Sequence, residues 1–282
     1  MTRMTRPTGT GTARRTGASL LFVLATASGV GAAFTLVSVE QEVQLGQQAQ
    51  AEINKEMPVL RDASLDRYVD SIGARLAANA PGPKYPYSFG VVNYKELNAF
   101  ALPGGPIYVH RGTIAAARTE AQLAGVMAHE VAHVAQRHAA KQISKGIVAN
   151  GLLGLLGAVL DDGGRGEQAA RIGASVVAQS VFMKFSRDDE SDADRMGAEI
   201  MERAGWDPHG LAEFMQVLQN EQKRSPSSVE TFFSSHPSPA GRVRELQGMV
   251  NGKSGRRDSE EFQSMKGRLR SLPPPQAMPR TN

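Results

Sequence analysis

The chain has 282 residues, with 32 Lys and Arg, 28 Asp and Glu and no cysteine, and this length fits one globular domain with extensions. The absence of cysteine excludes a disulfide scaffold, a thiolate zinc finger, an iron–sulfur site and a cysteine nucleophile. Residues 1–17 and 252–282 carry the excess positive charge, so the residues between them hold 21 basic and 25 acidic side chains and we expect no nucleic-acid partner.

The N-terminal segment is typical of an export signal. Four arginines in residues 1–17 precede 20 uncharged residues, 18–37, and small side chains at 25–27 and 31–33 suit a signal peptidase. The same stretch is long enough to span a bilayer, so an uncleaved anchor is one alternative and a buried helix is another. We therefore expect residues 1–38 to be a signal peptide or an N-terminal membrane anchor. The protein would be exported, either periplasmic or anchored facing the periplasm.

Residues 39–111 predict two helices followed by short strands. Apolar residues recur at helical spacing from 39 to 79, and Pro58 separates the two helices. Beyond a break rich in proline, three short strands are predicted, at residues 87–93, 98–102 and 107–111. Residues 103–106, Pro-Gly-Gly-Pro, form the predicted turn between the last two strands.

A long helix is predicted to begin at Thr119 and to continue to about Gln142. Gln122 follows Thr119 at the spacing of a capping box. Helical patterns recur later in the chain, at 208–222 and 239–250.

Two apolar segments separate the long helix from an acidic cluster at 188–194. Residues 146–160 are too few to span a membrane, so we interpret them as a buried or interfacial helix. Glycines recur along this segment and weaken a rigid helix, so we expect it to be a mobile cover over the metal site predicted below. Residues 172–185 form the second segment. The charged, proline-rich residues 251–282 are expected to be disordered.

The strongest chemical signal is the sequence His129-Glu130-Val131-Ala132-His133 inside the long helix. Residues four apart lie on one face of a helix, so both imidazoles can bind the same zinc ion. Glu130 is rotated by about 100° from His129 and can reach a water on that ion. Zinc lowers the pKa of such a water, and a carboxylate can then accept its proton as the water attacks a carbonyl.

A third zinc ligand must be a histidine or a carboxylate, because the chain has no cysteine. His138 lies about 140° around the predicted helix from His133 and is not expected to join the pair. Glu190, Asp194 and Gly197 share one helical stripe. Glu190 could bind the ion while Asp194 holds a ligand histidine by its other ring nitrogen. Alternatively, the acidic run is a solvated helix N-terminus, and spacing alone supports both interpretations equally.

Four segments together resemble the HtpX/Oma-type (BepA-like) zinc metallopeptidase family. They are the HEVAH motif, the segment 190–197, the strand and turn at 98–112, and the His-Pro segment 236–242. The resemblance covers about residues 39–250 and implies a zinc metallopeptidase domain there. It implies an α+β, predominantly α-helical fold, in which a zincin-like (gluzincin) core has a small β-sheet beside the HExxH helix, and one Zn²⁺ per chain.

The resemblance also implies a role for each matching residue. His129, His133 and Glu190 would be the zinc ligands. Glu130 would be the general base and proton shuttle, and Asp194 would be the partner of a ligand histidine. His236 would lie near the metal, where it stabilises the oxyanion or occupies the fourth position in a latent state, and Arg242 would orient that segment. Without the resemblance, His236 would be interpreted as a loop histidine, Arg242 as a surface residue and Asn98 as a turn residue. An extended peptide would be added to the strand formed by Asn98, Ala99, Phe100 and Ala101.

Together these observations predict a zinc-dependent endopeptidase that cleaves unfolded or misassembled envelope proteins, with Glu130 activating the water. The alternative is a chaperone-like binder of unfolded envelope proteins with a latent or mainly structural zinc site. A third option is a membrane-surface protein that uses residues 146–160. The N-terminal segment gives a possible membrane association, and the sequence leaves the oligomeric state open.

Overall fold

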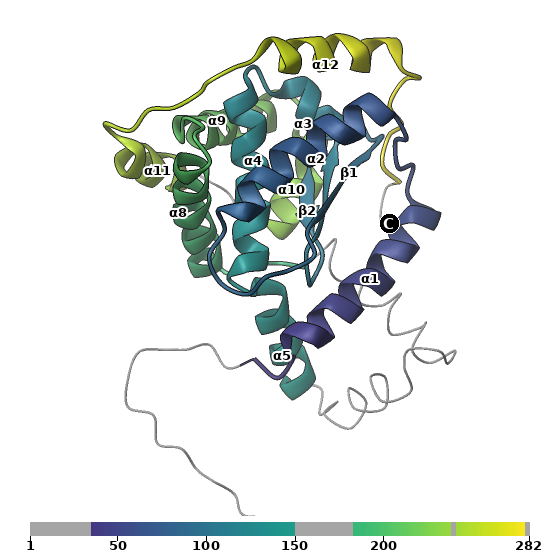
Figure 1. Ribbon diagram of the computed structural model, residues 1–282, viewed down its shortest axis with the longest axis vertical. Coiled ribbons are helices and arrows are strands. Elements are labelled where there is room, and N and C mark those ends of the chain that lie inside the picture. The colour runs from purple at the N-terminus through teal and green to yellow at the C-terminus, as the bar shows by residue number, and fades with distance from the viewer. Residues whose placement is uncertain (1–34, 150–182, 238–240, 280–282) are drawn as a thin grey trace, which may run out of the picture. The chain divides into compact units, whose positions relative to one another are not determined.

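The computed structural model describes residues 35–149, 183–237 and 241–279 (Figure 1). In chain order their elements are α1 (Val39–Glu56), α2 (Ala63–Ala78), β1 (Ser88–Val92), β2 (Ala99–Ala101), β3 (Pro106–His110), α3 (Arg111–Ala116), α4 (Glu120–Ala135), α5 (His138–Ala149), α8 (Arg187–Arg203), α9 (His209–Arg224), the 3₁₀ helix η1 (Pro226–Ser228), α10 (Glu230–Ser235), α11 (Arg242–Val250) and α12 (Glu260–Ser271). This part of the chain is predominantly α-helical with one small sheet, as predicted. Most of the predicted signal or anchor segment, and most of the apolar segments 146–160 and 172–185, lie outside the described residues.

The sheet places the two faces of each strand against different helices. Its order is β1-β3-β2, with β1 parallel to β3 and β2 antiparallel to it, so β2 is an edge strand. Successive side chains of a strand point to opposite faces. Accordingly, Phe100 and Tyr108 pack with Ile53 of α1, whereas Ala99 and Val109 belong to the larger core that includes α2 and α4.

The predicted Pro-Gly-Gly-Pro turn connects β2 to β3. Gly104 and Gly105 have φ values of 73° and 123°, which favour glycine because a Cβ would be strained there. A Cβ on Gly104 would also lie 2.5 Å from the backbone oxygen of Glu42, so the turn approaches α1 closely. The turn therefore fixes the edge strand against the first helix.

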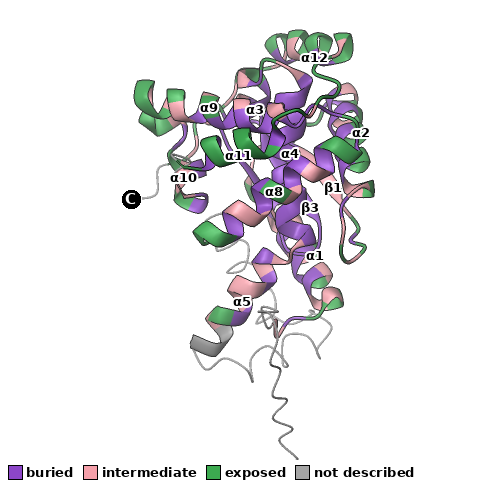
Figure 2. Ribbon diagram, turned by 90° about the vertical axis from the view of Figure 1, so that its left-hand side faces the viewer, coloured by how far each residue is buried: buried purple, intermediate pink, exposed green. Residues whose placement is uncertain are grey.

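Helix α4 is the centre of the described fold. Every residue from Glu120 to Ala135 is buried, and Figure 2 shows this helix in the buried colour between partly exposed neighbours. Helices α8 and α9 pack along one side of it and β2 and β3 along the other (Figure 1). Thr119 accepts a hydrogen bond from the Gln122 N–H, as the capping box predicts, while the Gln122 side chain accepts from the Arg118 N–H rather than from Thr119. A helix in this position carries its polar side chains into the interior.

The predicted end of the long helix is wrong. The helix stops at Ala135, and Arg137 adopts a left-handed φ of 61° before α5 begins at His138. Arg137 is held in that conformation by its hydrogen bonds to the Glu42 side chain and the Val37 carbonyl oxygen. The break changes the direction of the chain next to the HEVAH motif.

The prediction of disorder after Asn251 is also wrong for residues 251–279. Helix α12 begins at the N-cap Ser259 and buries Phe262 and Leu269 in the main core. Arg268 pairs with Asp62, the N-cap of α2, at 2.6 Å. A short amphipathic helix with few apolar residues is thus stabilised by contacts that its composition does not reveal.

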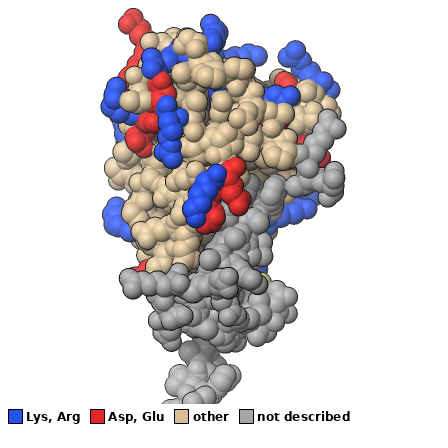
Figure 3. All heavy atoms as spheres, turned by 90° about the vertical axis from the view of Figure 1, so that its right-hand side faces the viewer, with Lys and Arg blue, Asp and Glu red and all other residues tan. Residues whose placement is uncertain are grey.

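Described charged side chains on the face drawn in Figure 3 occur in groups of both signs, separated by uncharged surface. Among the described residues, no helix is both long enough and apolar enough to cross a bilayer.

Candidate metal centre

Three separate helical segments bring four side chains together. His129 and His133 come from α4, Glu190 from the first turn of α8, and His236 from the residue after α10. All four are buried, and each offers one ligand atom within 4.8 Å of the others. The two Nε2 atoms of His129 and His133 are 3.0 Å apart, and Glu190 oxygens lie 3.6 and 3.4 Å from them. Four ligand atoms this close together could hold one metal ion.

The donor set fits a divalent ion such as zinc. Imidazole nitrogens and a carboxylate oxygen are the ligands left to zinc in a protein without cysteine. Glu130 supports the fit: within the described part of the chain its buried Oε1 atom has no hydrogen-bond partner, and it lies 3.7 Å from His236 Nε2. Buried polar atoms are normally hydrogen-bonded, so this oxygen calls for a partner such as a water molecule.

The local charges favour a cation. Burial by itself would raise the pKa of Glu190, but the neighbouring His236, His129 and His133 outweigh it and hold that pKa well below its usual range. Burial lowers the pKa of His133 well below its usual value, which keeps its ring neutral, the form that binds metals. At His129, Asp194 and Glu190 outweigh burial and raise the pKa to about 9. The carboxylates therefore favour a positive charge at His129, while His133 stays neutral.

Asp194 and Arg242 hold the cluster in place from behind. Asp194 Oδ1 lies 3.0 Å from His129 Nδ1, on the side of the ring opposite the cluster. Arg242 donates to both oxygens of Asp194, at 2.6 and 2.7 Å, and also to Glu190. The Arg242 guanidinium therefore connects Asp194 and Glu190 of α8 to α11. Arg242 is only 7% exposed, so it is not a surface residue.

Gly197 allows α8 to approach α4 at the motif itself. A Cβ at this position would lie 3.2 Å from the backbone nitrogen of His129 and 3.3 Å from its Cα. These atoms belong to a buried helix backbone and cannot move as freely as a side chain. This close approach brings Glu190 within reach of the histidines.

His138 is a residue of the site that the sequence analysis missed. Its Nδ1 atom lies 2.9 Å from Nδ1 of His133, and its ring is fully buried. If His133 presents Nε2 to a metal, its Nδ1 carries the proton and donates to His138. His138 remains outside the ligand cluster, as predicted, but the predicted 140° rotation was not the reason, because the two residues lie on different helices. No spacing rule signals this contact.

Aromatic rings enclose the cluster on one side. Phe185 lies 4.2 Å from His133 and 5.7 Å from His236, measured between ring centroids. Phe232 stacks on His236 at 4.7 Å. The remaining histidines are elsewhere: His110 contacts the Glu96 carbonyl oxygen, and His209 contacts Asp207. Phe185 and Phe232 therefore pack against His236 on this side of the cluster.

The edge strand β2 runs beside Glu130. The His110 N–H donates to the Asn98 carbonyl and the Leu102 N–H to the Pro106 carbonyl, so the backbone groups of Ala99 and Ala101 point away from β3. Burial raises the pKa of the Glu130 carboxyl, and the nearby Ala101 backbone N–H lowers it in part. Asn98, Ala99 and Phe100 are buried and Ala101 is partly buried, and no described residue pairs with either polar atom of the Asn98 amide. The predicted substrate strand therefore lies alongside the motif.

Comparison with known proteins gives consistent matches. The profile of peptidase family M48 matches residues 63–250. The chain is similar to the beta-barrel assembly-enhancing protease of Escherichia coli (strain K12), with 32% identity over 228 residues, 79% of this chain and 46% of the relative. It is also similar to the mitochondrial metalloendopeptidase OMA1 of Schizosaccharomyces pombe, with 27% identity over 219 residues, 76% of this chain and 62% of the relative. The chain thus spans about half the length of the beta-barrel assembly-enhancing proteases that it matches.

Proposed function

The chain belongs to peptidase family M48, and from this premise we propose that it is a zinc-dependent endopeptidase acting on unfolded or misassembled envelope proteins. Membership confirms the resemblance drawn from the four sequence segments. The observation that carries the proposal is the buried cluster of His129, His133, Glu190 and His236 with the unpaired Glu130 oxygen beside it. The fold proposed for this core is zincin-like, with α4 carrying the motif next to the edge strand β2.

Each side chain then has a defined task. His129, His133 and Glu190 would hold the zinc ion, which when bound supplies Lewis-acid chemistry by polarising a carbonyl and lowering the pKa of a water. Glu130 takes a proton from the attacking water and delivers it to the leaving amine. No described residue donates a hydrogen bond to its Oε1 atom, which leaves that oxygen available for the proton.

Asp194 and Arg242 are positioning residues in this proposal. Asp194 holds the His129 ring by its Nδ1 side, and Arg242 keeps Asp194 and Glu190 in register. His236 would stabilise the oxyanion in an open state or fill the fourth ligand position in a latent one. Its 2.9 Å contact with Glu190 supports either role.

Substrate polypeptides would add to β2 as a further strand. The outward-facing backbone groups of Ala99 and Ala101 supply hydrogen bonds that do not depend on the substrate sequence. Asn98 and Phe100 lie on the same strand with their side chains buried, and no described residue pairs with the Asn98 amide. Such binding suits unfolded chains.

The proposed compartment is the periplasm, where the protein would be either free or anchored to the membrane. This proposal rests on the pattern of residues 1–38.

Substituting Glu130 tests the proposal. Glu130→Gln keeps the shape of the side chain but cannot accept the proton, so we expect cleavage of an unfolded protein to fall by about 10²–10⁴-fold. Zinc content and the unfolding curve are measured on the same preparation, and both should match those of the unsubstituted protein. Equal cleavage rates for the two proteins would refute the proposed mechanism.

A chaperone-like function with a latent zinc site is the second candidate, favoured by one observation. His236 belongs to the four-residue cluster and is 1% exposed, so it already occupies the region where a fourth ligand would bind. This candidate expects His236→Ala to increase cleavage. The endopeptidase proposal, with His236 stabilising the oxyanion, expects the same substitution to reduce it.

A further inference from the structure

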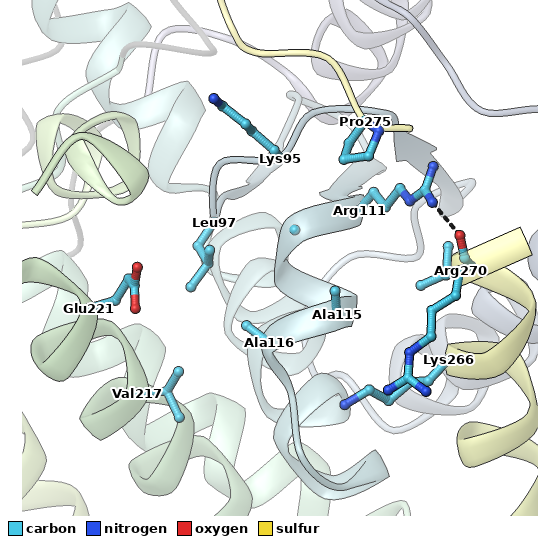
Figure 4. Close-up of a pocket in the computed structure, with 12 residues that line it drawn as sticks. Lys95, Leu97, Arg111, Ala115, Ala116, Val217, Glu221, Lys266, Arg270 and Pro275 are labelled. Atoms are coloured by element: carbon cyan, nitrogen blue, oxygen red, sulfur yellow. Dashed lines mark hydrogen bonds between the residues drawn. The ribbon is translucent and has the colours of Figure 1, made fainter. Parts of the chain in front are cut away.

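A pocket lies away from the metal centre, and none of the four cluster residues lines it. It is a cavity of about 470 Å³ bounded by α3, α9, α12 and the segment 95–97. Figure 4 shows Val217 and Glu221 on α9 facing Lys266 and Arg270 on α12, with Ala115 and Ala116 of α3 between them. Its volume is in the range of ordinary ligand sites. We call it the basic pocket.

Cations dominate the wall of the basic pocket. Lys95, Arg111, Lys266 and Arg270 line it against a single carboxylate, Glu221. Arg111 is committed to the fold, since its guanidinium donates to Asn93 and to carbonyl oxygens of residues 269–273. Within the described residues, no carboxylate pairs with the exposed side chains of Lys95 and Arg270. Two positive charges are therefore available to a ligand.

The cations on α12 also crowd one another. The pKa of Lys266 is lowered, first by burial and then by the charge of Arg270; Asp258 raises it in part and Arg118 lowers it further. Its ammonium group donates to the Ala117 carbonyl oxygen, which satisfies a hydrogen bond but brings no negative charge. An anion placed between these side chains would relieve the repulsion.

The pocket adjoins the amino-terminal end of β2. Leu97, which lines the pocket, is the residue before Asn98, and its N–H is bonded to the Ser228 carbonyl. A strand advances about 3.3 Å per residue, so the pocket begins roughly 10–15 Å from Ala101 and Glu130 along the line of β2. Because Ser228 occupies the strand edge at Leu97, a polypeptide lying on β2 would leave the strand at Asn98, and the segment beyond that point comes within reach of the pocket.

We propose that the basic pocket is an exosite for acidic segments of a polypeptide. Carboxylates of the bound segment pair with Lys95 and Arg270, while neighbouring apolar side chains cover Leu97, Val217 and Leu269. The Glu221 carboxylate on the opposite wall disfavours a densely charged phosphate ligand and suits a peptide, which also carries N–H donors. That the bound polypeptide is a substrate rests on the proposed endopeptidase function; the binding site itself does not.

Charge reversal tests the exosite. Lys95→Glu combined with Arg270→Glu changes two side chains without a described side-chain partner, so the fold should be unaffected. The matched control is Arg67→Glu combined with Lys84→Glu, an equal charge change at two exposed positions outside the pocket. Binding is measured by fluorescence anisotropy with full-length Glu130→Gln protein and two labelled peptides that differ only in four Glu or four Gln residues.

We expect the acidic peptide to bind about tenfold more tightly than the neutral one, the gain typical of two exposed ion pairs. The pocket variant should lose this preference and the control should keep it. Equal binding of the two peptides, or an equal loss in the control, would overturn the proposal. So would phosphatidylglycerol vesicles that displace the acidic peptide while their own binding depends on the same two side chains.

Cleavage separates the exosite from the catalytic proposal. With Glu130 restored, a substrate carrying an acidic segment about four residues from the cleaved bond should show a KM about tenfold higher in the pocket variant and an unchanged kcat. A changed kcat with an unchanged KM would count against the exosite. If no protein cleaves any substrate while the anisotropy result holds, the endopeptidase proposal fails and the binding site stands.

Discussion

Replacing Asp194 by asparagine tests whether the carboxylate behind His129 organises the metal centre. Asp194 is 2% exposed, and it accepts hydrogen bonds from Arg242 at 2.6 and 2.7 Å. Burial would raise the pKa of Asp194, but Arg242 and His129 outweigh it and lower that pKa, so the carboxylate is charged at neutral pH. Asparagine keeps the shape and one acceptor oxygen but removes the negative charge.

The expected cost follows from these contacts. A hydrogen bond to a charged group contributes about 1.5–3 kcal/mol, and breaking a buried ion pair costs about 3–5 kcal/mol. Because Arg242 keeps Glu190 as a partner, we expect the metal-free protein to lose about 2–4 kcal/mol in its free energy of unfolding. Loss of the support for the His129 ring should also weaken zinc binding by about 10–100-fold.

Urea unfolding of the metal-free protein and a zinc competition titration measure the two effects separately. Asp192→Asn is the matched control, because it makes the same chemical change on α8 in a half-exposed pair with Arg195. We expect this control to change stability by less than about 1 kcal/mol. If Asp194→Asn is as stable as the control and binds zinc as tightly, the assignment of Asp194 as a positioning residue is refuted.

Two further predictions concern residues outside the ligand set. His138→Phe keeps a buried ring but leaves the His133 Nδ1 proton without an acceptor, so we expect zinc affinity to fall about tenfold in a competition titration, and an unchanged affinity would contradict the role of His138. Hydrogen bonding from Arg268 lowers the pKa of Asp62 from 3.8 to about 2, so this pair stabilises the fold above about pH 4, and its contribution is lost as the pH falls through about 2. Between pH 5 and pH 2 the free energy of unfolding should therefore fall more steeply for the unsubstituted protein than for Asp62→Asn. The same pH dependence for both proteins would show that the pair contributes nothing.

Local patterns predicted most of the regular elements correctly. The two helices on either side of Pro58 and the three short strands are present, because periodicity and turn residues act over a few neighbouring positions. Short helices such as α3 and α10 were missed, since six residues contain too few turns to show a period. Helix α12 was missed because its ion pair joins residues 206 positions apart.

The sequence by itself determined the chemistry of the candidate site. The absence of cysteine restricts the ligands to imidazole and carboxylate, and the four-residue spacing of His129 and His133 places both rings on one face of any helix. Tertiary structure alone decided which other side chains join them. His236 meets Glu190 across 46 positions, and His138 reaches His133 because Glu42, 95 positions before Arg137, holds the chain in a break after α4. Within one helix the backbone fixes the relative positions of the side chains. Between helices these positions depend on how the whole core packs. At Gly197, for example, the missing Cβ lets α8 approach α4.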